Sequence, residues 1–500
     1  MTEQLAAQTA PGRDGSFAEQ PAAIMRDRLY LGGRWTSPAG DDTFDVVSPS
    51  TEKAVGTVPA GTPVDVDRAV AAAREAFDAG PWRWVSPTER AARLQPVLAG
   101  LRKRHDELVR LLVGEVGVPI SSCSAIGVAQ PIRTLEYYLG LAATFPFEET
   151  RGGLRGATVV REPVGVVAAI VPWNAPLRSI MNKLAPALVA GCSVVVKPAP
   201  ETPLNAFVLA EVLAEADLPP GLVSIVPAGR ETGEHLVRHP GVDKVAFTGS
   251  TAAGRRIMAA CAENLTRVGL ELGGKSAAIV LDDADLDVTV RRLTPLVVGN
   301  NGQACTAQTR ILVSRARHDE LVEALVAAFA AQRVGDPFDP ATDVGPLVSK
   351  AQYERVTGYL EMAAAEGARV AVGGGRPAGL DVGWYVEPTV LIGVDNGMRV
   401  AREEIFGPVA VMIPYDDVEQ AMAIADDSPY GLAGSVWTGD VAAGMVVARR
   451  IRTGTFSVNG AAQPVEAPFG GFKGSGIGRE YGPEGLDAFC EKKSIATRPL

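Results

Sequence analysis

The chain has 500 residues, of which 47% are hydrophobic and 21% charged, a composition typical of a globular protein with roughly two to four domains. Its 48 basic and 58 acidic residues leave a net charge of −10, so the basic footprint of a nucleic-acid-binding protein is missing. No apolar run approaches the roughly 20 residues that a membrane-spanning helix needs, and no membrane association is expected.

Cysteine usage and the N-terminus together favour a cytoplasmic protein. Five cysteines lie far apart without a CxxC pair, so neither a disulfide framework nor a zinc ribbon is indicated. His235 and His239 have the i, i+4 spacing of metal ligands on a helix, but no HExxH pattern accompanies them, and no metal site is expected. Residues 1–27 contain no secretory signal and are predicted to form a flexible tail.

The first part of the chain is predicted to be strands followed by helices. Alternating apolar residues and turn signals predict short strands within residues 29–47. Helical periodicity follows at residues 64–77, 87–105, 106–116 and 132–143.

From residue 158 onward, strands alternate with helices. The nearly continuous apolar run at residues 165–171 is typical of a strand buried on both faces of a parallel sheet. Further strands are expected at residues 158–163, 193–197, 222–226 and 244–247, and helices at residues 177–190, 205–216, 231–239 and 251–262. A second series begins near Gly273, with strands at 277–281, 310–313, 369–372 and 409–413, a further segment at 385–394, and helices at 286–298, 319–329, 351–366 and 418–425. This alternation predicts doubly wound α/β sheets, which bind ligands beyond the carboxyl ends of their strands.

One such carboxyl end is the turn Thr248-Gly249-Ser250, which precedes a helix opening at Thr251. The free N–H groups of a helix N-terminus suit a phosphate. The usual GxGxxG fingerprint is missing, so this turn alone is equally consistent with a plain strand-to-helix connection.

Cys305 has a setting unlike that of a packed core cysteine. It follows an apolar run and lies among small and polar residues, where Asn300, Asn301 and Gln303 supply donors and acceptors and Gly302 allows close approach of the backbone. Backbone N–H groups near a sulfur lower its pKa and can hold an oxyanion. The alternative is a core thiol, which is the commoner role of an isolated cysteine.

The chain resembles the NAD(P)-dependent aldehyde dehydrogenase superfamily at Glu271-Leu272-Gly273-Gly274-Lys275-Ser276. Cys305, which lies 34 positions after Glu271, belongs to the same resemblance. Other matching motifs follow the family's order along nearly the whole chain after the tail: Pro172-Trp173-Asn174, Lys197-Pro198, Phe247-Thr248-Gly249-Ser250-Thr251, Gly302-Gln303-Ala304-Cys305, Glu403-Glu404-Ile405-Phe406-Gly407-Pro408-Val409, Ser457-Val458-Asn459 and Pro468-Phe469-Gly470-Gly471.

The resemblance implies an α/β fold of two doubly wound Rossmann-type domains with a small β extension for oligomerisation. The implied division is an NAD(P)-binding domain at residues 28–143 and 162–272, a catalytic domain at 273–475, and the extension at 144–161 and 488–500. Strands of the extension would pair across subunits by edge addition, so a homodimer or homotetramer is expected.

The resemblance also implies the oxidation of an aldehyde to its acid. Cys305 would be the nucleophile, forming a thiohemiacetal and then a thioester. Asn174, with the backbone N–H of Cys305, would hold the oxyanion, and Glu271 would activate the hydrolytic water. Lys183 and Glu480 match positions of a proton relay, although an ordinary ion pair is an alternative interpretation.

The expected cofactor is NAD, with NADP possible. The resemblance assigns Lys197 and Glu404 to ribose hydroxyls and Ser250 to the pyrophosphate. The remaining cofactor-binding residues that it implies are Val171, Pro172, Trp173, Thr248, Gly249, Leu272 and Phe406.

Several positions depart from the family pattern. Three positions after Lys197 the chain has Pro200, where NAD-preferring relatives carry a ribose-binding glutamate; Pro200 also adds no cation for a 2′-phosphate, which favours NAD. Ala175 and Asn182 replace larger residues and predict a less aromatic pocket open to bulky or branched aldehydes. Arg178 is interpreted as a surface arginine in preference to a ligand of a substrate carboxylate.

Three alternatives remain open from the sequence. A CoA-acylating semialdehyde dehydrogenase shares this fold, but its members commonly lack the base that Glu271 represents. A non-catalytic NAD-binding scaffold is disfavoured by the intact Cys305, Asn174 and Glu271. A Cys–His hydrolase needs a histidine partner, and none of the four histidines lies within ten residues of Cys305.

Overall fold

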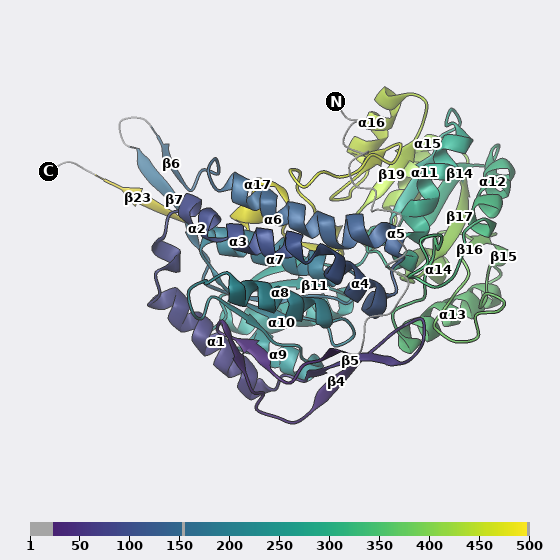
Figure 1. Cartoon of the computed structure of the whole chain (residues 1–500). Helices are drawn as coiled ribbons and strands as arrows, with labels where there is room; N and C mark the ends of the chain where they lie inside the picture. Colours follow the sequence, from purple (N-terminus) through teal and green to yellow (C-terminus); the bar gives the residue numbers. More distant parts are fainter. Residues whose placement is uncertain (1–23, 153–155, 498–500) are drawn as a thin grey trace.

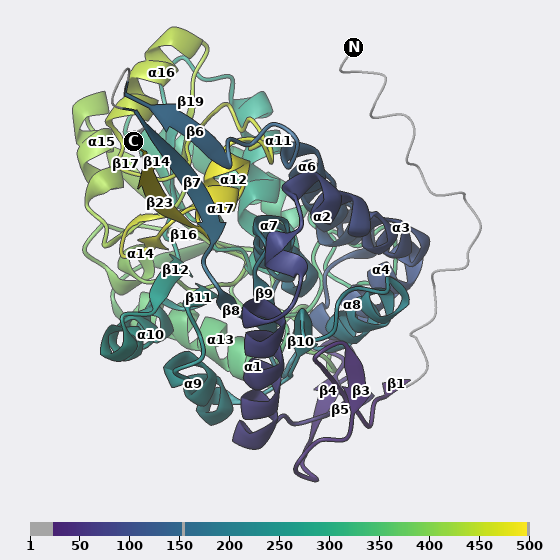
Figure 2. The same ribbon diagram turned by 90° about the vertical axis from the view of Figure 1, so that its left-hand side faces the viewer.

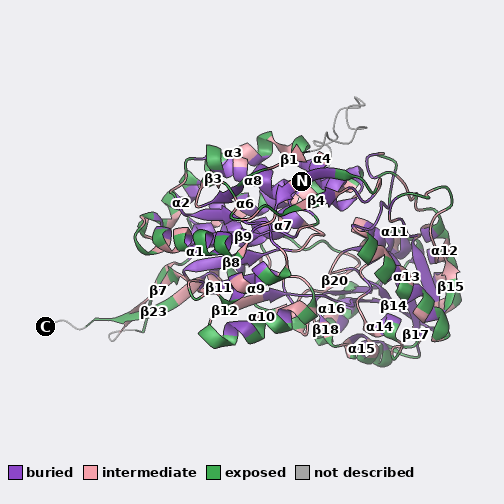
Figure 3. Ribbon diagram, turned by 90° about the horizontal axis from the view of Figure 1, so that it is seen from below, coloured by how far each residue is buried: buried purple, intermediate pink, exposed green. Residues whose placement is uncertain are grey.

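The computed structural model describes residues 24–152 and 156–497. Two mostly parallel sheets form the centres of two α/β bodies that lie side by side, and a narrow antiparallel sheet projects from the first body, on the left in Figure 1. Seen from below, the strands inside both bodies are mostly buried, while the outward faces of the surrounding helices are exposed (Figure 3).

The first sheet has eight strands in the order β22-β12-β11-β8-β9-β10-β2-β3. Its bounds are β2 (Leu29–Leu31), β3 (Arg34–Thr36), β8 (Val166–Ile170), β9 (Ser193–Lys197), β10 (Val223–Ile225), β11 (Lys244–Thr248), β12 (Arg267–Glu271) and β22 (Gly476–Ile477). The five strands from β12 to β10 are parallel, and the strands at the two ends are antiparallel to their neighbours.

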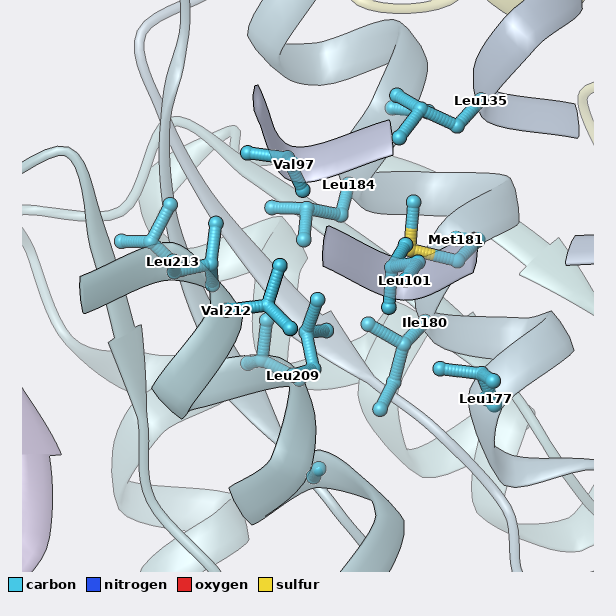
Figure 4. Packing of buried hydrophobic residues seen from close by; sticks show 14 of the residues in the cluster. Val97, Leu101, Leu135, Leu177, Ile180, Met181, Leu184, Leu209, Val212 and Leu213 are labelled. Atoms are coloured by element: carbon cyan, nitrogen blue, oxygen red, sulfur yellow. The ribbon is translucent and has the colours of Figure 1, made fainter. Parts of the chain in front are cut away.

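Helices cover both faces of this sheet, as Figure 2 shows. One face carries α1 (Pro63–Asp78), α9 (Arg230–Arg238) and α10 (Thr251–Asn264). The other carries α7 (Pro176–Ala190) and α8 (Leu204–Glu215), covered in turn by α2 (Pro87–Arg93), α3 (Gln95–Lys103), α4 (His105–Val116) and α6 (Gln130–Leu141). Leucine, isoleucine, valine and methionine side chains of α3, α6, α7 and α8 interdigitate there (Figure 4). Because both faces are covered, β8 and β9 are buried at every position and consist mainly of apolar residues.

The second sheet has seven strands in the order β15-β16-β17-β14-β13-β19-β20, all parallel except β15. The strands are β13 (Ala277–Val280), β14 (Arg310–Ser314), β15 (Arg369–Val372), β16 (Thr389–Ile392), β17 (Val409–Tyr415), β19 (Gly434–Trp437) and β20 (Ser457–Val458). α11 (Leu286–Val298) and α12 (His318–Ala330) cover one face, and α13 (Lys350–Ala365), α14 (Arg399–Arg402), α15 (Val418–Asp426) and α16 (Val441–Arg450) the other.

Three smaller sheets complete the described chain. β1 (Ile24–Met25), β5 (Ala54–Pro59) and β4 (Thr43–Val47) form one, and β18 (Tyr430–Gly431) pairs with β21 (Phe472–Lys473). The projecting sheet consists of β23 (Cys490–Ala496), β7 (Ala157–Pro163) and β6 (Glu148–Arg151), and α17 (Gly482–Asp487) precedes β23.

The predicted parallel α/β sheets are confirmed, with differences in detail. Most of the predicted tail lies outside the described residues, but Ile24–Met25 pair with β5, so a loose tail is wrong for these two residues. Strands β5, β12 and β19 and helix α16 were not predicted individually. A π-helix, η2 (Cys123–Ala129), joins the short helix α5 (Ile120–Ser122) to α6, and apolar periodicity alone does not signal such a winding. The exact limits of the domains remain a prediction.

Candidate active site

The strand order places two predicted motifs beside each other. From β8 the chain continues to β9 and β10 on one side, whereas β11 and β12 lie on the other side of β8. β8 and β11 are paired, with Ile170 opposite Phe247, so the segments that follow them emerge together at a topological switch point. A cleft of about 300 Å³ opens there and is lined by Trp173, Asn174 and Ser250. We call it the cofactor cleft.

Cys305 reaches this cleft on a tightly anchored loop after α11. Asn300 and Asn301 have φ of 53° and 60°, and Gly302 has φ of 73°. The Asn301 amide donates to the carbonyls of Gly117 (2.9 Å) and Pro346 (2.8 Å). A Cβ at Gly302 would lie 2.1 Å from the Gly407 carbonyl carbon, which explains the glycine.

Two polar residues of this loop stabilise its conformation through hydrogen bonds to the backbone of a neighbouring segment. Gln303 is buried, and its Oε1 accepts from the backbone N–H of Val348 (2.9 Å). Asn301 Oδ1 accepts from the backbone N–H of Gly345 (2.7 Å). Their amides therefore hold the loop, and the expectation that they act beside the sulfur is wrong for these two residues.

Asn174 is held against the same loop. Its Nδ2 donates to the Gln303 carbonyl (2.8 Å), while Asn300 Nδ2 donates to the Asn174 carbonyl (3.0 Å). An amide nitrogen has two N–H groups, so one remains for a ligand in the cleft.

Glu271 ends β12 opposite Thr248 of β11 and is 6% exposed. It lines the cofactor cleft together with Cys305. Its Oε2 has no hydrogen-bond partner among the described residues. Burial, followed by the nearby Glu480 carboxylate, raises the pKa of Glu271 well above its ordinary value, while Lys183 opposes the shift. A Cβ at Gly470, whose φ is +156°, would lie 2.7 Å from Glu271 Oε1, so the glycine-rich loop permits this placement.

Lys183 and Glu480 form a buried ion pair behind the base. Lys183 Nζ donates to Glu480 Oε1 (2.6 Å) and to the Thr248 hydroxyl (2.5 Å). Asn182 Nδ2 donates to the other carboxylate oxygen of Glu480 (2.8 Å). Thr248 faces Glu271 across the two strands, so the pair lies close to that carboxylate.

The electrostatic setting of Cys305 differs from the sequence expectation of a lowered thiol pKa. The net pKa of Cys305 is raised to about 12: desolvation by the walls of the cleft is the largest cause, Arg178 lowers the pKa, and Glu404, Glu271 and Glu480 raise it. The expectation considered only the local backbone, whereas the folded chain brings three carboxylates towards the sulfur.

Two aromatic rings and a carboxyl group also line the cofactor cleft. The rings of Trp173 and Phe406 meet edge to face, with centroids 5.3 Å apart, and Phe406 adopts φ of 64°, a conformation concentrated at functional sites. Glu404 Oε1 accepts from the backbone N–H of Gly274 (3.0 Å), and burial raises the pKa of Glu404 to about 7.

The predicted cofactor residues divide into two groups. Those that line the cleft are Pro172, Trp173, Thr248, Gly249, Ser250, Leu272, Glu404 and Phe406. Val171 and Lys197 are buried and fall outside the described residues lining the cleft. Lys197 Nζ donates to the carbonyls of Pro198 (3.0 Å) and Ala228 (2.6 Å), and burial lowers the pKa of Lys197 to about 8. Ser250 caps α10, its hydroxyl accepting from the backbone N–H of Ala253 (3.3 Å).

The structure adds cleft residues that were missed in the sequence. Gln352 of α13 donates to the Phe406 carbonyl (2.7 Å), and Arg355 donates to the carbonyls of Ile405 (3.2 Å) and Glu404. Their spacing of three residues on a helix is common, so no signal in the sequence distinguishes them. Arg178 lines the cleft beside Cys305, and the interpretation of Arg178 as a surface residue is wrong.

Two further cavities adjoin the cofactor cleft. The first, here the reaction cavity, has about 410 Å³ and is lined by Cys305, Glu271, Asn182, Phe469 and Tyr481, among others. The second, here the side cavity, has about 420 Å³ and lies between η2, the start of α7 and the end of α11. Its lining contains no aromatic residue in the described part of the chain. Ile126, Arg178, Leu296 and Thr306 line both cavities, so the two spaces are neighbours.

Two other searches concern metals and membranes. Within residues 24–152 and 156–497, no group of three or more His, Cys, Asp or Glu side chains could hold a metal ion. No helix in the same ranges is both long and apolar enough to cross a bilayer.

Parallel sheets with a cleft at the switch point are typical of dinucleotide-binding enzymes, and a cysteine facing that cleft is suited to covalent catalysis. Comparison with known proteins agrees. The profile of the Aldehyde dehydrogenase family matches residues 35–495. A geranial dehydrogenase of Castellaniella defragrans is 48% identical over 474 residues, which cover 94% of this chain and 99% of that protein. A 3-succinoylsemialdehyde-pyridine dehydrogenase of Pseudomonas sp. is 43% identical, with the same shares covered.

Solved structures are equally similar. A Mycobacterium tuberculosis aldehyde dehydrogenase in complex with NAD+ superposes with a TM-score of 0.94 at 49% identity, covering 95% of this chain and 99% of that one. A Pseudomonas syringae aldehyde dehydrogenase mutant with NAD+ and octanal has a TM-score of 0.91 at 40% identity, covering 94% and 96%. The chain belongs to the aldehyde dehydrogenase family. It is an NAD(P)-dependent enzyme that oxidises an aldehyde to the carboxylic acid, so the predicted family, fold and enzyme class are confirmed.

Proposed function

We propose that this chain oxidises a bulky or branched apolar aldehyde with NAD, with Cys305 as the nucleophile and Glu271 as the base for hydrolysis. The observation that carries the proposal is that Cys305, Asn174 and Glu271 line one cleft, which continues to the Ser250 turn at the start of α10. The direct test follows reduced cofactor by absorbance across a panel of aldehydes with NAD and with NADP. Loss of turnover in Cys305→Ser is the expected control, and unchanged activity in that variant would reject the nucleophile.

The first chemical stage is addition of sulfur to the substrate. The Cys305 thiolate attacks the aldehyde carbon, and the carbonyl oxygen takes up the electron pair. The remaining N–H of Asn174 Nδ2 and the Cys305 backbone N–H stabilise this oxyanion, and one such donor is typically worth about 3 kcal/mol of barrier. When bound, NAD supplies the acceptor for the hydride that leaves the thiohemiacetal carbon.

The second stage hydrolyses the resulting thioester. Glu271 takes a proton from water, the water oxygen attacks the acyl carbon, and the Cys305 sulfur leaves with its electron pair. The raised pKa of Glu271 makes its carboxylate a stronger base than an exposed one, and its unpaired Oε2 is available to a water molecule. Lys183 donates hydrogen bonds to the Thr248 hydroxyl and to Glu480. In this proposal Lys183 and Glu480 form the relay that carries the proton away from Glu271.

The residues of the cofactor cleft fit a dinucleotide. The first turn of α10 offers backbone N–H groups to a pyrophosphate, and Glu404, held by the Gly274 N–H, offers its second oxygen to a ribose hydroxyl. Lys197 lies at the end of β9 with a third N–H donor free for the adenosine ribose. Pro200 adds no cation for a 2′-phosphate, which favours NAD over NADP.

The size of the substrate follows from the cavities beside Cys305. Ala175 and Gly299 line the side cavity, and a Cβ at Gly299 would meet nothing within 4 Å. Leu112, Val116 and Ile126 give this space an apolar wall suited to a branched hydrocarbon body. One relative of this chain is named geranial dehydrogenase, and this name agrees with the proposed substrate class.

Filling the side cavity tests this substrate class. Ala175→Phe and Gly299→Val each add bulk to the lining of the side cavity, and we expect kcat/KM for a branched ten-carbon aldehyde to fall about tenfold or more, because a hydrophobic pocket rejects a substrate that no longer fits. Acetaldehyde, which needs no side cavity, is the internal control. Equal losses for both aldehydes would contradict the assignment of the side cavity.

A CoA-acylating reaction is disfavoured by Glu271 in the cleft. Formation of the acid without added CoA distinguishes the two reactions, and a strict requirement for CoA would reject hydrolysis.

The assembly that we propose is a cytoplasmic homodimer or homotetramer formed through the projecting sheet. In β23, residues 492–496 are exposed, and both β23 and β6 are edge strands. An unpaired edge is a template for another chain. Lys493→Pro, which removes a backbone donor from β23, should lower the mass measured by light scattering, and an unchanged mass would contradict this interface.

A further inference from the structure

Arg178 has an unusual position for a cation. It lies in the first turn of α7, four residues after Asn174, and is half-buried. Its side chain lines the cofactor cleft, the reaction cavity and the side cavity, and Cys305 lines the first two of these. Arg178 is therefore placed where the three spaces meet, next to the reactive sulfur.

Other cations around the site are already engaged. Lys183 is bonded to Glu480, Arg355 to the carbonyls of Ile405 and Glu404, and Arg479 to the carbonyls of Gly471 and Gly478. Among the described residues, by contrast, the guanidinium group of Arg178 makes no hydrogen bond and no ion pair. Its charge is available to an anion in the cavities.

The charged groups that face Cys305 are mostly of one sign. Glu271 comes from β12, Glu404 from the segment after α14, and Glu480 from the loop before α17, and Arg178 from α7 is the cation that acts on the sulfur. Arg178 also faces the Tyr481 hydroxyl, and Asp343 lines the side cavity. Three carboxyl groups thus disfavour a thiolate at this place, and one positively charged side chain favours it.

We propose that Arg178 is a positioning residue that increases the fraction of the Cys305 sulfur present as thiolate before the aldehyde arrives. On ionisation the S–H bond breaks, the electron pair stays on sulfur, and the proton passes to water in the reaction cavity. The role rests on the proposed function of Cys305 as the nucleophile, but ionisation of the sulfur can be measured without any substrate.

Two physical effects support this assignment. Arg178 lowers the pKa of Cys305 against the effect of burial, because a nearby opposite charge favours the charged form of a titratable group. In addition, α7 has no side-chain cap at its N-terminus, and Ala175, Arg178 and Ser179 line the cofactor cleft together with Cys305, so the positive end of the helix is directed towards the space that contains the sulfur. A guanidinium stays protonated throughout the useful pH range, so its effect does not vanish as the thiol titrates.

The test is the pH dependence of alkylation of the full-length enzyme by iodoacetamide, without aldehyde or cofactor. Mass spectrometry locates the label, and Cys305→Ser gives the background from the other four cysteines. We compare wild type with Arg178→Gln, which removes the charge, and Arg178→Lys, which retains it. Arg315→Gln, which alters an exposed ion pair with Asp416, is the control for loss of an arginine elsewhere.

We expect Arg178→Gln to move the alkylation profile of Cys305 upward by about one pH unit, so that the rate at neutral pH falls about tenfold. Arg178→Lys should retain most of the wild-type rate, and Arg315→Gln all of it. A Gln profile that superposes on wild type overturns the proposal. If circular dichroism shows that Arg178→Gln is unfolded, Arg178→Met takes its place with the same two outcomes. A shifted profile in an enzyme that oxidises no aldehyde would uphold the role of Arg178 while rejecting the proposed function.

Discussion

Replacing Glu271 by Gln separates the two chemical stages. The substitution preserves the shape of the side chain but removes its ability to take a proton from water. Addition of the Cys305 sulfur and loss of hydride do not need this base, whereas hydrolysis of the thioester does. We therefore expect Glu271→Gln to complete one half-turnover and then to stall as a covalent acyl-enzyme.

The expected loss in kcat follows from the position of Glu271 in the structure. Its Oε2 is buried without a partner, and no other carboxylate among the described residues lines both the cofactor cleft and the reaction cavity. A positioned general base contributes about 10² to 10⁴ in rate, so kcat should fall by that factor, equivalent to about 3 to 5 kcal/mol of barrier. Stability should change little, because a neutral amide has a smaller desolvation cost than a buried carboxylate.

Rapid mixing with NAD and an accepted aldehyde measures both stages. We expect a burst of reduced cofactor that approaches one equivalent per active site, followed by a slow steady state. Intact-mass spectrometry should then show the acyl group on Cys305, and Cys305→Ser should give neither burst nor adduct. A Glu271→Gln enzyme with wild-type kcat, or with slow turnover but no adduct, would refute the assignment of the base.

Three further results are expected. Gly470→Ala should lower kcat about a hundredfold, because the new Cβ would lie 2.7 Å from Glu271 Oε1 and must displace it, while Gly358→Ala, whose Cβ meets nothing within 4 Å, should retain wild-type kinetics. Lys183→Met should lower the free energy of unfolding by about 3 to 5 kcal/mol, because it removes the charged partner of the largely buried Glu480 carboxylate. Urea denaturation should show recovery in the double variant Lys183→Met/Glu480→Gln, and additive losses would contradict the pairing. Because burial raises the pKa of both the thiol and the base, and each acts in its deprotonated form, kcat/KM should rise from about pH 6 to about pH 9, and a decline over this range would exclude that interpretation.

Much of the fold could be predicted because it follows from local patterns. Strands such as β8 and β9 consist mainly of apolar residues, whereas a helix such as α10 has a different periodicity and a serine cap. Motifs in the order of a known family then indicated the class of enzyme.

Other features depended on how distant segments meet. Asn174 and Gln303 are bonded across 129 positions, and Lys183 and Glu480 across 297. Arg178 reads as an ordinary helical arginine in the sequence, yet the crossing of α7 with the Cys305 loop places it at the junction of three cavities.

The chain alone therefore specified which segments become strands and helices and which residue types are available for the chemistry, because backbone propensity and apolar periodicity act over a few neighbours. The protonation state of Cys305, the environment of Glu271 and the shape of the substrate space were settled by folding. Burial and electrostatic coupling depend on distances in space, and the carboxylates and cation that set the pKa of Cys305 come from four separate segments.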